Sequence, residues 1–112
     1  MARILICEPQ EDVRRLLERM VARLGHEPIA VAIPGPEHLT SADVLILEPA
    51  APVGAVFAQA ASLAVPELPL ICASVAAPPQ ELADLDVQFA ASLVKPYTLE
   101  QLRVAIEQAL HS

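Results

Sequence analysis

Aromatic side chains are scarce in this chain, which has two phenylalanines, one tyrosine and no tryptophan. Their scarcity argues against a platform on which nucleic-acid bases or flat cofactors stack. Basic residues are also few: 7 lysines and arginines stand against 14 acidic residues, a formal net charge of −7. A protein that binds a nucleic-acid backbone needs a basic stripe, so we expect no nucleic-acid partner. The sequence has only three glycines and no glycine-rich phosphate-binding loop.

Disulfide and membrane signals are missing as well. The two cysteines, Cys7 and Cys72, lie far apart in apolar runs without a CxxC motif, which predicts a reducing, cytoplasmic location. The N-terminal apolar stretch is too short for a signal peptide. Residues 49–66 carry no charge, but three prolines interrupt them. The proline-free part, 53–65, would span roughly 20 Å as a helix, less than the roughly 30 Å of a bilayer core, so we expect no membrane association.

Apolar residues, in contrast, are abundant and are arranged in short runs. The 112 residues are 54% hydrophobic, which predicts one domain, 1–112, around a single core. Apolar runs of five or six residues without polar alternation are typical of strands buried on both faces of a parallel sheet. The five predicted strands span 3–7, 29–33, 43–48, 68–73 and 90–94.

Helical patterns separate these runs. Apolar residues at helical spacing predict an amphipathic helix over 13–24, capped by Gly25, and a second helix over 53–64. The Thr98–Gln101 segment matches a capping box and opens a closing helix. Short helices are expected at 37–41 and 78–81. Strands that alternate with helices predict an α/β fold, a parallel sheet with helices on both faces.

Four chemically capable residues follow or end predicted strands: Glu8, Glu48, Ser74 and Lys95, the only lysine. Sites in such sheets form at the carboxyl ends of the strands, so we expect these side chains on one edge. Carboxylates hold a hard cation such as Mg²⁺, and a lysine neutralises phosphate charge. The set therefore indicates a site of the kind that handles a phosphoryl group.

These residues and their neighbours resemble the receiver domain of bacterial two-component response regulators, the CheY-like family, over essentially the whole chain. The resemblance implies a single doubly wound, five-stranded parallel sheet of the flavodoxin/CheY type, with strand order 2-1-3-4-5 and short helices 2 and 4. It also implies a signalling role in the cytoplasm. The segments that carry it are Ile4–Pro9, Arg14–Leu17, Leu24–Gly25, Asp43–Glu48, Pro69–Ser74 and Leu93–Tyr97.

The resemblance assigns a position to each residue of the predicted site. Glu8 and Pro9 take the positions of the family's acidic pair, and Glu48 takes that of the phosphoaccepting aspartate. Ser74 and Lys95 take the hydroxyl and lysine positions. Two prolines fit as well: one, Pro52, lies four residues beyond the acceptor position, and the other follows the lysine through a bond that receivers usually hold cis.

Three departures distinguish this chain from the family pattern. Glu48 is one methylene longer than aspartate, and a displacement of about 1 Å can cost on the order of 10²-fold in rate. Pro9 supplies no carboxylate, and Ser92 stands where the family places its switch aromatic. We therefore expect a pseudo-receiver in which Glu48 carries no phosphate and pairs with Lys95. Mg²⁺ binding should be absent or weak, with Glu8 and Glu48 as the remaining candidate ligands.

The predicted function is signal transduction by protein–protein interaction, through the helix 4–strand 5–helix 5 face near Ser92, Tyr97 and Gln101. A weak homodimer through this face is one outcome that the resemblance allows. One alternative is a conventional Mg²⁺-dependent, phosphoaccepting regulator with a weakened site, and another is a small-ligand sensor that uses the same edge. No nucleophile–base pair stands out, so we expect no enzyme. A purely structural ion pair between Glu48 and Lys95 is the simplest interpretation of the edge.

Overall fold

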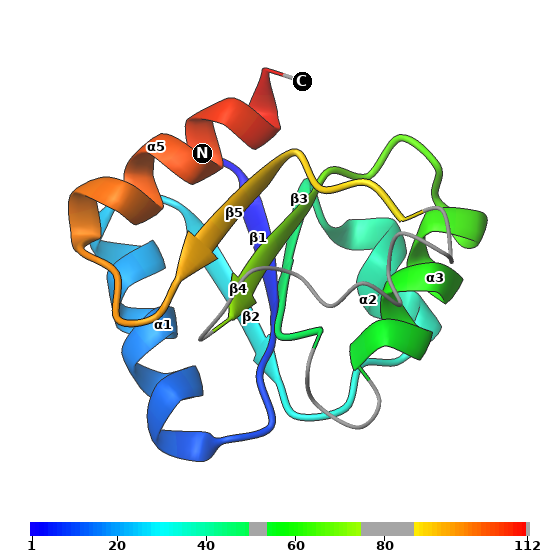
Figure 1. Ribbon diagram of the computed structural model, residues 1–112, viewed down its shortest axis with the longest axis horizontal. Helices are drawn as coiled ribbons and strands as arrows, with labels where there is room; N and C mark the ends of the chain where they lie inside the picture. Colours follow the sequence, from blue (N-terminus) through cyan, green and yellow to red (C-terminus); the bar gives the residue numbers. More distant parts are fainter. Residues whose placement is uncertain (50–53, 75–86, 112) are drawn as a thin grey trace.

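The computed structural model describes residues 1–49, 54–74 and 87–111, and within them five parallel strands form one sheet (Figure 1). The strand order is β2-β1-β3-β4-β5, which confirms the predicted topology. All four pairs of neighbouring strands are parallel, so the five strands have their carboxyl ends at the same end of the sheet, called here the carboxyl edge. The strands are β1 (Arg3–Cys7), β2 (Glu27–Val31), β3 (Val44–Leu47), β4 (Leu70–Ser74) and β5 (Ala91–Val94).

Helices cover both faces of the sheet, as predicted (Figure 1). One layer holds α1 (Glu11–Arg23) and α5 (Leu99–Leu110), and the other holds α2 (Pro36–Ser41) and α3 (Gly54–Ala64). The short α2 confirms the single helical turn that the sequence predicts after the second strand. The helix expected at 78–81 and the family's proline at Pro52 lie outside the described residues.

The core has two halves because successive strand residues point to opposite faces. On the first face, isoleucines of β1 and β3 pack against Leu17, Leu102 and Ile106 of α1 and α5. On the second face, leucines of the same strands pack against Ala58 and Ala61 of α3. The central strands are fully buried, which is why they appear in the sequence as continuous apolar runs.

Helix ends follow the predicted chemistry. Gly25, with φ +88°, adopts the left-handed conformation just after α1, where glycine is favoured. At the start of α5 the Thr98 side chain accepts a hydrogen bond from the Gln101 N–H (3.1 Å), and the Gln101 side chain accepts one from the Thr98 N–H (2.8 Å). The capping box is therefore confirmed, and it defines where α5 begins.

Two predicted strands are displaced in the structure. The second strand begins at Glu27 rather than at residue 29, because Glu27 pairs with Arg3 in the ladder and binds its guanidinium at 3.1 Å. The fourth strand runs over 70–74 rather than 68–73. It starts after Pro69, whose carbonyl still accepts a hydrogen bond from the Leu45 N–H (3.0 Å) but which has no N–H of its own to donate. The pairing of Glu27 with Arg3 explains the first shift, and the missing N–H of Pro69 explains the second. Neither can be predicted from a run of apolar residues.

Candidate functional site

The carboxyl edge of the sheet brings together the four residues that the sequence singles out. Glu8 follows β1, Glu48 follows β3, Ser74 ends β4 and Lys95 follows β5. Glu8 and Ser74 are buried, with 4% and 2% of their surface exposed. The strands that lead to these residues are buried and apolar, so the polar groups lie where the hydrophobic core ends.

Lys95 lies between the two carboxylates. Its Nζ is 3.0 Å from Oε2 of Glu8 and 3.0 Å from Oε2 of Glu48, and we call this group the carboxylate–lysine triad. The ion pair between Glu48 and Lys95 confirms the contact predicted from the longer side chain. The participation of Glu8 was not predicted, although Glu8 and Glu48 follow neighbouring strands, and this adjacency was the available signal.

The triad is largely withdrawn from water. Its side chains are 5%, 11% and 18% exposed for Glu8, Glu48 and Lys95. Burial alone would lower the pKa of Lys95, but the hydrogen bonds and charges of Glu8 and Glu48 outweigh it, so the net pKa is raised. Lys95 is therefore a protonated ammonium at neutral pH, and its charge is shared between the buried carboxylate of Glu8 and the partly buried carboxylate of Glu48.

The loop from β1 into α1 holds Glu8 in place. The second oxygen of Glu8, Oε1, accepts a hydrogen bond from the Gln10 N–H at 3.3 Å, close to the start of α1. The Arg14 side chain donates to the Glu8 carbonyl oxygen at 2.9 Å. This contact of Arg14 was not predicted from the sequence. Pro9 lies between these contacts, is exposed and supplies no carboxylate.

Backbone contacts place Lys95 against β4. The Lys95 N–H donates to the carbonyl oxygen of Ser74 at 2.8 Å, so the strand ladder extends by one bond beyond the last residue of β5. The Lys95–Pro96 peptide bond is cis, as the family resemblance implies. Tyr97 follows, half-buried against the α1/α5 side of the core, and burial raises the pKa of its hydroxyl.

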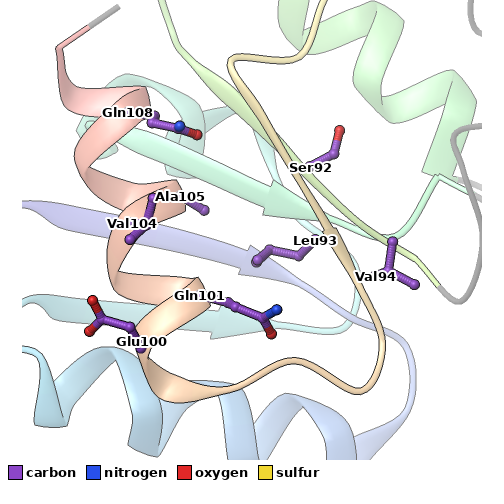
Figure 2. A pocket seen from close by; sticks show the side chains of 8 residues that line it. All are labelled: Ser92, Leu93, Val94, Glu100, Gln101, Val104, Ala105 and Gln108. Atoms are coloured by element: carbon purple, nitrogen blue, oxygen red, sulfur yellow. The ribbon is translucent and has the colours of Figure 1, made fainter.

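Strand β5 runs beside α5, with Leu93 pointing toward α5 and Ser92 and Val94 pointing away from it (Figure 2). Alternate residues of this edge strand are buried (Ala91, Leu93) and exposed (Ser92, Val94). A hollow of about 400 Å³ lies between β5 and α5, and Gln101 and the half-exposed Val104 line its helical wall. Ser92, at the family's switch-aromatic position, contributes only a hydroxymethyl group to this surface.

The described part of the chain offers no cluster of metal-ligating side chains. Among residues 1–49, 54–74 and 87–111, no three histidines, cysteines or carboxylates cluster in a way that could hold a metal ion. The two carboxylates of the triad both face the Lys95 ammonium.

None of the helices in residues 1–49, 54–74 and 87–111 has the length and apolar character of a membrane-spanning segment.

Solved structures with the same fold are numerous, whereas no protein-family model and no curated protein matches the sequence. A response regulator receiver domain protein from Clostridium thermocellum superposes with a TM-score of 0.83, at 20% identity, over 99% of this chain and 95% of the other. The chemotaxis protein CheY4 of Vibrio cholerae has a TM-score of 0.83 at 23% identity, over 98% and 99%.

A third structure is the receiver domain of a Pseudomonas aeruginosa sensor histidine kinase, which holds a magnesium ion in its active-site cleft. It has a TM-score of 0.76 at 19% identity, over 99% of this chain and 98% of the other. All three similarities cover nearly the whole of both chains. The chain therefore has the CheY-like fold of the response-regulator receiver domains, from β1 through α5.

Proposed function

We propose that this protein is a pseudo-receiver: a two-component-type signalling domain that acts by binding other proteins and is not switched by phosphorylation. The observation that carries the proposal is the position of Lys95, whose ammonium is 3.0 Å from both Glu8 and Glu48. The names of the similar structures, which include response regulators and a chemotaxis protein, support the signalling role. No catalytic activity is part of the proposal.

Magnesium fits this edge poorly. Mg²⁺ requires nearly octahedral oxygen coordination, and Pro9 removes one carboxylate from the acidic pair. Each remaining carboxylate already has an oxygen on the Lys95 ammonium, whose positive charge repels a second cation at this range. Glu8 and Glu48 would be the ligands of any weakly bound ion, and we propose that binding is absent or weak.

Phosphorylation at Glu48 is disfavoured for the same reasons. A phosphoaccepting carboxylate must be free to attack and must be positioned against a metal ion and a donor. Here the Glu48 side chain is held in an ion pair that resembles the contact a phosphate would make with Lys95 in the family. The domain therefore has one state at this edge, and there is no second population for a phosphoryl group to favour.

The partner-binding face is proposed to be the exposed surface of β5 and α5. The hollow between these elements is lined by polar and apolar groups, and Ser92 leaves it without the aromatic side chain that moves in switching receivers. Because this surface has no aromatic side chain that moves, its affinity for a partner protein should not depend on phosphorylation. The helix 4 part of the predicted face falls in residues outside the described ranges.

The decisive experiment is incubation with acetyl phosphate and Mg²⁺, followed by intact mass spectrometry and by NMR titration of Mg²⁺ alone. We expect no phosphoryl adduct on the wild-type protein and no amide shifts near Glu8 and Glu48. The matched control carries Pro9→Asp and Glu48→Asp, which restore the acidic pair and the shorter acceptor, and it should bind Mg²⁺. A Mg²⁺-dependent adduct at Glu48 of the wild type would support the conventional regulator instead.

A second experiment tests the interaction role. Capture from extracts of the source cells would compare the wild type with Gln101→Ala and Val104→Ala on the proposed face and with Glu48→Ala in the triad. Loss of a partner with the α5 substitutions and retention with Glu48→Ala would support binding through α5 without switching. Loss with Glu48→Ala alone, with the fold intact by circular dichroism, would mean that the edge still controls the output.

A further inference from the structure

Arg14 stands apart from the other arginines of α1. The other three arginines of this helix are exposed, whereas Arg14 is half-buried. Its Nη1 donates a hydrogen bond of 2.9 Å to the carbonyl oxygen of Glu8, whose side chain in turn binds the ammonium of Lys95 at 3.0 Å. Arg14 is therefore one hydrogen bond away from the carboxylate–lysine triad.

The connection between β1 and α1 depends on Arg14 at two points. Pro9 has no N–H to donate, and Gln10, at the N-cap position, makes no side-chain capping hydrogen bond. The contact between the Gln10 N–H and Oε1 of Glu8 is long, at 3.3 Å. Arg14 bonds on both sides of Pro9, because its side chain donates to the Glu8 carbonyl and its backbone N–H donates to the Gln10 carbonyl at 2.9 Å. Arg14 thus joins both ends of this connection to α1.

The direction of the Glu8 side chain depends on how this connection is held. Glu8 lies just beyond the last residue of β1, so the strand itself does not fix the peptide group that follows it. The bond from the Arg14 guanidinium is charge-assisted and therefore stronger than one between neutral groups. It fixes that peptide group while the Glu8 carboxylate lies on Lys95. Without it, the carboxylate would be free to turn toward solvent.

We propose that Arg14 is the positioning residue of the triad, which keeps Glu8 on Lys95 and through which α1 holds the carboxyl edge closed. The inference rests on the proposed function, in which the triad is the one state of this edge, and it adds the residue that maintains that state. The effect of Arg14 on Lys95 passes through Glu8. Anything that draws Arg14 away from the Glu8 carbonyl would free that carboxylate, so α1 is the element from which the edge is regulated.

Lys95 offers a selective probe because it is the only lysine of the chain. Lysine labelled with ¹³C and ¹⁵N gives one side-chain signal by NMR, and the exchange of its ammonium protons with water reports how firmly the ammonium is bound. Arg14→Ala should speed this exchange at least about tenfold, the equivalent of one hydrogen bond to a charged group. The pKa of Lys95, followed by the same signal, should fall, because one of the two carboxylates that raise it moves away.

The matched control is Arg15→Ala, which removes the neighbouring arginine of the same helix. Arg15 is exposed and binds Glu11 at 2.6 Å, so this change should leave the Lys95 signal as it is in the wild type. Glu8→Gln gives the exchange rate expected when the Glu8 charge is lost outright. Adding Arg14→Ala to Glu8→Gln should then change the Lys95 signal little, because residues that act through one another are not additive.

Three results would overturn the proposal: unchanged Lys95 exchange in Arg14→Ala, an equal change in Arg15→Ala, or a further change of full size when Arg14→Ala is added to Glu8→Gln. Circular dichroism checks each fold. If Arg14→Ala does not fold, Arg14→Gln replaces it and should change the exchange in the same direction. The samples contain neither Mg²⁺ nor a phosphoryl donor. A phosphoryl adduct on Glu48 would therefore refute the proposed function alone, and unchanged exchange would refute the role of Arg14 alone.

Discussion

The two helical layers of this domain solve the same packing problem with different side chains. The α1/α5 layer buries large residues, among them Leu17, Leu102 and Ile106, and its outer side carries ion pairs such as Arg15–Glu11 at 2.6 Å. The α3 helix buries two alanines and exposes Val56 and Leu63. Both layers expose some apolar side chains, Leu16 of α1 among them, but only the α1/α5 layer sets charged pairs beside them. Helix α3 has no charged residue along its length.

The largest effect on the free energy of unfolding is expected at the carboxylate–lysine triad, which lies between the two helical layers. Lys95→Met leaves the buried carboxylates of Glu8 and Glu48 without their shared cation, and removal of one partner from a buried ionic group costs about 3–5 kcal/mol. Urea unfolding measures the loss. Adding Glu8→Gln and Glu48→Gln to the same variant removes the two negative charges and should recover most of the lost stability. If Lys95→Met alone is as stable as the wild type, the triad does not contribute to stability in the way proposed.

The two layers should respond in opposite ways to changes in side-chain size. Leu102→Ala in α5 opens a cavity in the first layer and should cost about 2–5 kcal/mol. Ala61→Leu in α3 overfills the close contact of the second layer and should cost about 1–3 kcal/mol. Chemical denaturation of both variants tests the comparison. A stabilising Ala61→Leu would mean that α3 is loosely packed.

Alkaline pH should destabilise the protein through its buried thiols. Burial raises the pKa of Cys7 from 9.0 to about 12, and burial and then Glu48 raise that of Cys72 to about 11. The unfolded chain loses these protons first, so their stabilisation is complete below pH 9 and is lost as the pH rises toward 12. Each thiol contributes a slope of about 1.4 kcal/mol per pH unit.

The double variant Cys7→Ala, Cys72→Ala is the control for this loss. Its free energy of unfolding should fall less steeply above pH 9, and a residual decline is expected because the pKa values of Lys95 and Tyr97 are also raised. Equal slopes for the variant and the wild type would contradict the assignment to the thiols. Both cysteines should also react slowly with thiol reagents near neutral pH, because the thiolate is the reactive form.

A smaller effect is expected at the start of α5. Thr98→Ala removes the side chain that accepts the Gln101 N–H and should cost about 1 kcal/mol. Gln10 at the same position of α1 makes no side-chain capping hydrogen bond, so Gln10→Ala should have less effect. Thermal unfolding of the two variants measures the difference, and equal losses would show that the box contributes little.

The smallest effect on the folded monomer is expected on the outer side of α3. Leu63→Gln changes an exposed side chain and should alter the monomer's free energy of unfolding by less than about 0.5 kcal/mol. A large loss of stability at low protein concentration would mean that Leu63 belongs to the monomer's own packing.

Much of the fold was predictable because its signals are local or periodic. The central strands are buried on both faces and therefore appear as apolar runs, and the Thr98 box and Gly25 mark helix ends by their own chemistry. The second and fourth strands were misplaced by one to two residues. Their limits depend on the Arg3–Glu27 pairing and on Pro69, which are properties of the ladder rather than of apolar runs.

The candidate site was predictable as a set but not as a geometry. The alternation of strands and helices places Glu8, Glu48, Ser74 and Lys95 on one edge, because parallel strands end together. The contact of Glu48 with Lys95 followed from the length of the side chain. That Glu8 shares the same ammonium, and that Arg14 braces its carbonyl, depends on distances between β1, β5 and α1.

The class of fold could be predicted from the sequence: an α/β chain with acidic charge and with glutamate and proline at the positions where the resemblance places carboxylates. Tertiary structure alone decided how these residues act. Folding put Lys95 within 3.0 Å of two buried carboxylates and left the uncharged α3 with one side against the sheet and the other in solvent. Residue types and periodicity are properties of the chain, whereas the sharing of one cation and the exposure of one helix face arise only when distant segments are packed together.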